Sequence, residues 1–248
     1  AGFTCPNRDG SKGIGGCTFC NNSSFSPGDK QKKTIPIPTQ LNNGKAVILK
    51  RTGEQRYLAY FQAYTNTYAD VDYLAKQYEQ ALAEENVIGL SIGTRPDCVP
   101  DEVLDLLSFY RDQGHEVWLE LGLQSAHDKS LDIINRGHGF AEYVTAIKAA
   151  QKRKLSVCTH LILGLPGEDY NMMQQSLFSV LDLGVEGLKL HPLHVVKGTQ
   201  LARQWKLGTY KPLSMGAYID AAVNLIELTP EDIIYHRVTG TAQQDLLL

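Results

Sequence analysis

The chain has 248 residues, 43% of them hydrophobic, and a formal net charge of -3 at pH 7. A chain of this size buries a substantial core without disulfides, and its small negative charge gives no support for nonspecific nucleic-acid binding through global charge. No apolar run approaches the roughly 20 residues of a membrane helix and no secretory leader is apparent, so we expect a cytoplasmic protein with no membrane role.

Predicted strands and helices alternate at a spacing of about 30 residues, which is typical of parallel βα units. Residues 1–4 are predicted to be the end of a strand, and further strands are predicted at 56–62, 87–92, 116–121, 155–163 and 187–191. Helices are predicted at 37–51, 73–85, 100–111, 127–136, 143–153, 171–183, 200–205 and 215–228. Six units of this kind predict an α/β fold, a partial (βα)6 TIM-like barrel.

We assign residues 1–195 to this barrel, including an N-terminal cysteine loop, and residues 196–248 to a C-terminal helical extension packed on it. The chain starts without Met and ends in three leucines, so we expect further segments at both ends. The sequence does not define an oligomeric state.

The cysteine loop holds three of the five cysteines, Cys5, Cys17 and Cys20, with glycines between them. Clustered thiols outside a secreted framework more often hold a metal than form disulfides. Two groups fit: a structural zinc ion with a fourth ligand such as histidine, and a 4Fe-4S cluster with one iron open to a substrate. The isolated Cys98 and Cys158 are predicted to be packed thiols without chemistry.

Polar residues follow several predicted strands, at the barrel edge where βα barrels carry their chemistry. Arg95 is predicted to contact substrate or a cofactor carboxylate, or to cap the rim, and His191 and His194 to contact substrate or to pack in the loop. Glu120 either points into the barrel toward a cationic or hydroxyl group or pairs with Lys189.

The loop pattern, with eleven residues between Cys5 and Cys17 and then Thr-Phe-Cys, resembles the radical S-adenosylmethionine (SAM) superfamily, with a longer first spacing than usual. The resemblance implies a 4Fe-4S cluster on Cys5, Cys17 and Cys20, whose open iron binds SAM. It also implies that an electron from the cluster cleaves SAM reductively to a 5'-deoxyadenosyl radical, and that Phe19 packs near the adenine.

Two further stretches are similar to one branch of that superfamily, which contains the oxygen-independent coproporphyrinogen oxidases, the methylthiotransferases and the elongator-type enzymes. These stretches are Gly-Leu-Gln-Ser at 122–125 and Asn-Arg-Gly at 135–137. By this resemblance Gln124 and Arg136 contact the SAM ribose and carboxylate, and an arginine fork suits a carboxylate because two N–H donors meet two oxygens.

The segment 160–168, with Gly-Leu-Pro-Gly, resembles the same branch's turn beneath the adenosyl group, which implies that His160 and Leu163 line SAM. The branch often has Asp where this chain has His160. In this branch a loop lies beside the SAM amino group, and Thr65 is the one residue of this chain that matches that loop directly.

The resemblance is nearest to the YhcC/YtqA group, and it implies a radical SAM enzyme served by a reductant such as flavodoxin or ferredoxin. Members of that group have been linked to tRNA wobble uridine modification, so tRNA is the expected partner. A basic run of Lys30, Lys32, Lys33, Lys45, Lys50 and Arg51 would meet phosphates or form a solvated face. The competing hypothesis is a non-catalytic iron-sulfur or zinc binding or scaffold protein with the same fold.

Overall fold

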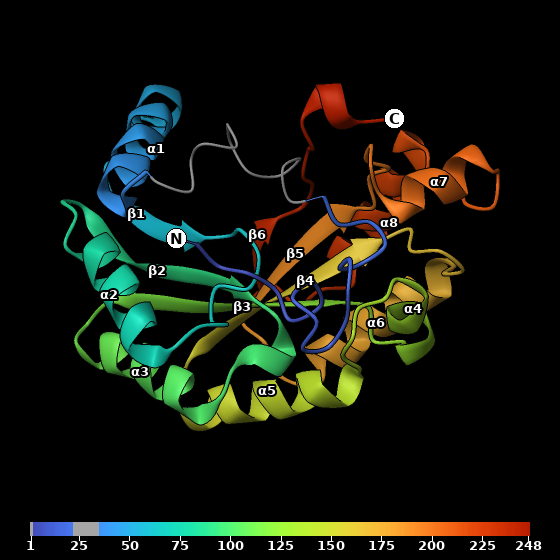
Figure 1. Cartoon of the computed structure of the whole chain (residues 1–248). Helices are drawn as coiled ribbons and strands as arrows, with labels where there is room; N and C mark the ends of the chain where they lie inside the picture. Colours follow the sequence, from blue (N-terminus) through green and yellow to red (C-terminus); the bar gives the residue numbers. More distant parts are fainter. Residues whose placement is uncertain (1, 22–34) are drawn as a thin grey trace.

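The computed structural model describes residues 2–21 and 35–248 and has one parallel sheet, curled into a half-barrel (Figure 1). The strands lie side by side in chain order: β1 Tyr57–Phe61, β2 Val87–Thr94, β3 Glu116–Gln124, β4 Ser156–Leu163, β5 Gly187–Pro192 and β6 Ile234–Arg237. The predicted partial α/β barrel is confirmed. Parallel neighbours in chain order require a crossover after each strand, and helices provide most of these crossovers.

Helices pack around the sheet, and several of them lie on its convex face along the lower side of Figure 1. They are α1 Ile37–Thr52, α2 Val71–Leu82, α3 Asp101–Asp112, α4 Asp128–Ile133, α5 Phe140–Lys152, α6 Tyr170–Leu181, α7 Gln200–Lys206 and α8 Met215–Glu227, with 3-10 turns η3 Pro96–Cys98 and η4 Gln244–Leu246. Each predicted helix is present, with bounds that differ by a few residues. The largest difference is at α4, which ends at Ile133 because the chain then turns through left-handed backbone at Asn135 and Gly137.

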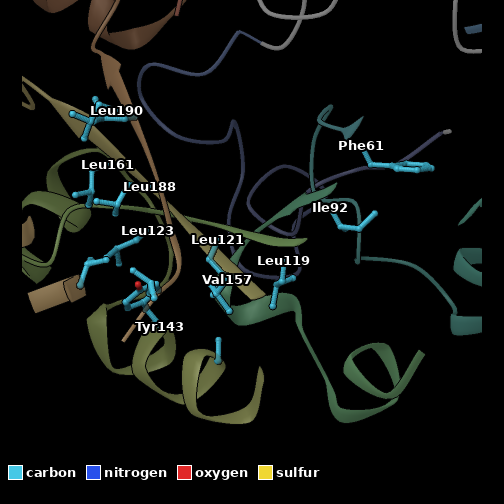
Figure 2. Close-up of a cluster of buried hydrophobic side chains, with 14 of the residues drawn as sticks. Phe61, Ile92, Leu119, Leu121, Leu123, Tyr143, Val157, Leu161, Leu188 and Leu190 are labelled. Atoms are coloured by element: carbon cyan, nitrogen blue, oxygen red, sulfur yellow. The ribbon is translucent and has the colours of Figure 1, made fainter. Parts of the chain in front are cut away.

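Side chains of β3 show why the sheet has two different faces. Leu119, Leu121 and Leu123 are fully buried and belong to the hydrophobic core, which the ring of Tyr143 on α5 also enters (Figure 2). The alternating residues point to the concave face, and Glu120 among them is also buried. Because successive strand side chains point to opposite faces, the helices receive an apolar face and the concave face, here called the lumen, receives polar groups.

Two segments differ from the sequence prediction. Residues 2–4 form no strand, although the Thr4 carbonyl accepts a hydrogen bond from the Thr65 amide at 3.1 Å. The sixth strand is instead β6, which pairs with β5 and lies in a stretch where no strand was predicted. With four residues and a register shift beside it, β6 is too short and irregular to show a strand period. The stretch after residue 195 therefore contributes a strand to the sheet as well as helices.

Candidate functional site

The cysteine loop is a series of tight turns held by backbone hydrogen bonds. The Arg8 amide donates to the Cys5 carbonyl at 2.8 Å, and the Cys20 amide donates to the Cys17 carbonyl at 2.9 Å. A Cβ atom on Gly16, whose φ is +82°, would lie 2.8 Å from the Arg8 Nε atom. Glycine at this position therefore lets the Arg8 side chain cross the loop and donate to the Cys20 carbonyl at 3.1 Å.

Hydrogen bonds join the loop to the turn that follows α4. The amide group of Asn7, which is 1% exposed, donates to the Asn135 carbonyl at 2.5 Å, and the Asn135 side chain donates to the Gly16 carbonyl at 2.9 Å. The Thr18 amide adds a third bond, to the Ile134 carbonyl at 2.9 Å. Two motifs that lie more than a hundred residues apart in the sequence thus form one structural unit (Figure 1).

This unit places the Arg136 guanidinium beside the cysteines. Its Nη1 atom lies 3.6 Å from the Cys17 Sγ atom, Nη2 donates to the Gly122 carbonyl at 2.5 Å, and the buried Nε atom finds no partner among the described residues. Burial and the neighbouring Cys17 thiol raise the pKa of Cys20, whereas the Arg8 and Arg136 guanidiniums lower it. These mutual effects show that the thiols and the guanidiniums share one neighbourhood.

The three loop thiols are all free and available as metal ligands. Within residues 2–21 and 35–248, three ligand atoms of His, Cys, Asp or Glu come within 4.8 Å of one another at Glu120, Cys158 and His236, and the loop cysteines are not gathered this closely. A tetrahedral zinc ion would hold its sulfurs about 3.8 Å apart. A cubane cluster binds each thiolate through a different iron and holds its sulfurs farther apart, so thiols that are not tightly gathered are compatible with a cluster.

Arg95 lies at the rim and is occupied by an ion pair. Its Nε and Nη2 atoms each donate to the Asp97 carboxylate at 2.9 Å, and Lys12 of the cysteine loop reaches the same carboxylate at 2.7 Å. Burial alone would raise the pKa of Asp97, but these cations hold it at about 2. Arg95 therefore links η3 to the loop, and its Nη1 atom, buried without a partner in the described chain, is the part left for a ligand.

Gln124 ends β3 in strained backbone, with φ at +84°, next to a register shift between β3 and β4. Side chains rarely adopt this conformation, and such residues concentrate at functional sites. A Cβ atom on Gly122 would lie 2.8 Å from the Gln124 Nε2 atom and 3.0 Å from the Arg136 Nη2 atom. Only glycine at 122 lets both side chains fold over the end of β3. Gln124 and Arg136, which the sequence motifs assign to the same cofactor, therefore lie close together in space.

The adjoining Ser125 connects this strand end to the Gly-Leu-Pro-Gly turn, because its hydroxyl donates to the Glu168 carboxylate at 2.5 Å. Gly164 in that turn has φ at +87° and its carbonyl accepts from the Tyr210 hydroxyl at 2.8 Å. Leu163 is buried in the core, and its carbonyl accepts from the Leu193 amide at 3.1 Å.

The remaining predicted cofactor residues lie in or beside the same region. Thr65 is 1% exposed and is bonded through its amide to Thr4, at the start of the cysteine loop. Phe19, within the loop, is partly buried against the hydrophobic core. His160 points from β4 into the lumen. The ligand roles of these residues stay predictions.

Glu120 lies in the lumen and fulfils both predicted alternatives, because it accepts a hydrogen bond from a hydroxyl and also pairs with Lys189. Its carboxylate accepts from Ser91 at 2.5 Å and from Lys189, and it contacts the ring nitrogens His160 Nε2 at 2.8 Å and His236 Nδ1 at 3.3 Å. Burial would raise its pKa, but these partners hold the pKa of Glu120 far below its usual range. The Lys189 ammonium already supplies the charge that a metal would bring, so we assign no metal to Glu120, Cys158 and His236.

Sequence reasoning missed His236 because it lies on β6, which is too short and irregular to be predicted as a strand. The two predicted substrate histidines differ. His194 Nε2 lies 2.7 Å from the Gly240 carbonyl, which fits loop packing. His191 faces the lumen, with its ring 5.5 Å from that of His160, and burial is the main cause that lowers its pKa to about 3.

The other predicted features are placed as follows. Cys98 and Cys158 are buried, as expected for packed thiols, and burial raises the pKa of Cys98 to about 12. Of the basic run, Lys30, Lys32 and Lys33 lie outside the described residues, and Lys45 pairs with Glu84 at 3.6 Å. In the part of the chain that the structure describes, no helix is long and apolar enough to cross a membrane.

Comparison with known families gives the identification. Residues 5–180 match the radical SAM superfamily, and residues 185–248 match the Radical_SAM C-terminal domain. The chain belongs to the radical SAM superfamily. It is therefore a radical SAM enzyme, and the family implies a 4Fe-4S cluster and SAM as its cofactors.

Among curated proteins, the chain is 51% identical over 247 residues to protein YhcC of Escherichia coli, covering 100% of the chain and 78% of that protein. It is 41% identical over 248 residues to the uncharacterized protein YtqA of Bacillus subtilis, covering 100% and 76%. A tRNA uridine(34) acetyltransferase of Methanocaldococcus jannaschii is 33% identical over 134 residues, covering 52% of the chain and 24% of that protein. The predicted YhcC/YtqA kinship is confirmed.

Solved structures confirm the fold. The archaeal Elp3 of Methanocaldococcus infernus has a TM-score of 0.72 at 20% identity, covering 85% of this chain and 55% of its own. The coproporphyrinogen III oxidase HemN of Escherichia coli has a TM-score of 0.56 at 19% identity, covering 86% and 49%. The chain thus spans about half of each solved relative.

Proposed function

We propose that this radical SAM enzyme modifies the side chain of a tRNA wobble uridine, in the cytoplasm, with electrons from a flavodoxin or ferredoxin. The observation that carries the substrate is the 33% identity over 134 residues to a protein named as a tRNA uridine(34) acetyltransferase. The lumen supports a small polar substrate part, because its buried groups are hydroxyl, imidazole, carboxylate and ammonium rather than aliphatic.

Within the proposal, Cys5, Cys17 and Cys20 hold the cluster, and Phe19, Thr65, Gln124, Arg136, His160 and Leu163 surround SAM. When bound, the cluster and SAM supply reductive cleavage to a 5'-deoxyadenosyl radical. The guanidinium of Arg136 lies 3.6 Å from the Cys17 sulfur, and its unpartnered Nε atom is available to the SAM carboxylate.

Glu120 fixes the tautomer of His160. The ring is neutral, because burial lowers its pKa, and the anionic Glu120 contacts Nε2 at 2.8 Å. A carboxylate with a low pKa can only accept, so Nε2 carries the proton and Nδ1 is left as an acceptor. His160 can therefore accept a hydrogen bond from a ribose hydroxyl, which is the task that an Asp performs in related enzymes of this branch.

The test compares modified nucleosides of tRNA from anaerobically grown cells with and without the gene. We expect one wobble uridine derivative to change, with restoration by the wild type and by Cys98→Ala, a buried thiol outside the loop, but not by Cys17→Ser. An unchanged nucleoside profile would refute the tRNA substrate. Reconstituted Cys17→Ser protein should also release no 5'-deoxyadenosine, which checks the cluster assignment independently of the substrate.

A further inference from the structure

Arg237 enters the lumen from β6, a strand that the sequence analysis did not anticipate. It pairs in register with Lys189, after a shift between Leu188 and Lys189. Paired residues on neighbouring strands share a face of the sheet, so Arg237 points into the lumen with Lys189. The shift also lets His236 contact Glu120, so the successive residues His236 and Arg237 both point to the lumen face of the sheet.

The charge of Arg237 has no counterion in the described structure. The Lys189 ammonium and the Glu120 carboxylate balance each other, and no described carboxylate lies within 4.0 Å of the Arg237 guanidinium. Its charge acts on Tyr60, His160 and His191, which are neutral groups in this setting because burial raises the pKa of the tyrosine and lowers those of the histidines. Arg237 therefore adds a positive charge to the lumen that no described carboxylate balances at ion-pair distance.

Arg237 and His191 converge on one small space. A Cβ atom on Gly240 would lie 3.1 Å from His191 Nδ1 and 3.8 Å from Arg237 Nη1. Neither ring nitrogen of His191 has a hydrogen-bond partner among residues 2–21 and 35–248, whereas the Gly240 carbonyl is occupied by His194. Because residue 240 is glycine, a small space stays open beside the Arg237 guanidinium and the unpaired His191 imidazole.

We propose that Arg237 and His191 form an oxyanion subsite that binds a phosphate or carboxylate group of the substrate. A guanidinium presents paired N–H donors that match the two oxygens of such a group, and a neutral imidazole donates one further N–H. This proposal depends on the proposed function in one respect, which is that the substrate binds in the same lumen. It requires an anionic substrate part but not tRNA.

Calorimetric titration of the cluster-loaded, SAM-bound protein tests the subsite with uridine, uridine 5'-monophosphate and 5-carboxymethyluridine. We expect at least one anionic probe to bind about tenfold or more tightly than uridine, the usual size of a charge-assisted hydrogen bond. Arg237→Gln should abolish that preference, and the matched control Arg56→Gln, an exposed arginine just before β1, should retain it. Preference for the monophosphate identifies a phosphate, and preference for the carboxymethyl nucleoside identifies a base-borne carboxylate.

Three outcomes would overturn the proposal: equal affinities for all three probes, an unchanged preference in Arg237→Gln, or a loss of SAM affinity in that variant, which would assign Arg237 to the cofactor. If Arg237→Gln does not fold, Gly240→Ala serves instead, because its added Cβ narrows the subsite and should weaken the anionic probes selectively. Inorganic phosphate contains no nucleoside and should compete with the favoured probe in the wild type. We expect this competition by phosphate even if the tRNA nucleoside profile does not change. The anion subsite and the tRNA substrate are therefore tested independently.

Discussion

At the scale of single residues, Glu120 decides how the lumen is organised. A carboxylate offers about four lone-pair directions, and here it meets a hydroxyl, an ammonium and two imidazoles. The strand period alone placed Glu120 on the lumen face. Of its partners, Lys189 was one of two predicted alternatives, whereas His236 could not be predicted because it lies on a strand with no clear sequence signal.

We predict that Glu120→Gln lowers the free energy of unfolding by about 3–5 kcal/mol, the usual cost of breaking a buried ion pair by removing one partner. Lys189 is 4% exposed and would keep its charge without compensation. Urea unfolding of the protein under anaerobic conditions measures the change. The double variant Glu120→Gln with Lys189→Met removes the stranded charge and should recover much of the loss. A single variant within about 1 kcal/mol of the wild type would contradict the assignment.

At the scale of elements, the cysteine loop and the turn after α4 act as one unit. Sequence analysis found both motifs, since each has characteristic residue types, but nothing in either one predicts that Asn7 bonds to Asn135. That contact depends on the ending of α4 at Ile133 and on the positive φ of Asn135. The predicted helix over 127–136 extended through this turn and would have removed it.

We therefore predict that Asn7→Ala lowers the iron content of the reconstituted protein and speeds amide hydrogen exchange across residues 5–20. The variant leaves the Asn135 carbonyl without its partner, at a cost of about 1–3 kcal/mol. The exposed Ser11 of the same loop provides the control, and Ser11→Ala should keep both properties near the wild type. Wild-type iron content together with wild-type exchange in Asn7→Ala would show that the loop does not depend on this contact.

At the scale of the whole molecule, periodicity was enough to predict a partial barrel but not its last strand. The predicted total of six strands counted residues 1–4, of which the described residues 2–4 form no strand, and it omitted β6. A long strand such as β3 can be recognised from the sequence because both of its faces are buried. A four-residue edge strand such as β6 is recognised only by its pairing with the neighbouring strand. The division at residue 195 stays a prediction, and β6 makes it testable.

We predict that a fragment ending at residue 195 will not unfold cooperatively. It would lose β6 from the edge of β5 and would also lose α8, whose Ala221, Ala222 and Leu225 are buried. Removing a strand and a packed helix exposes apolar surface and an unpaired edge, which favours aggregation. Thermal circular dichroism and size-exclusion chromatography measure the effect, and coexpression with residues 196–248 should restore a soluble complex. A fragment that stays monomeric and melts cooperatively near the temperature of the full chain would establish residues 1–195 as an independent domain.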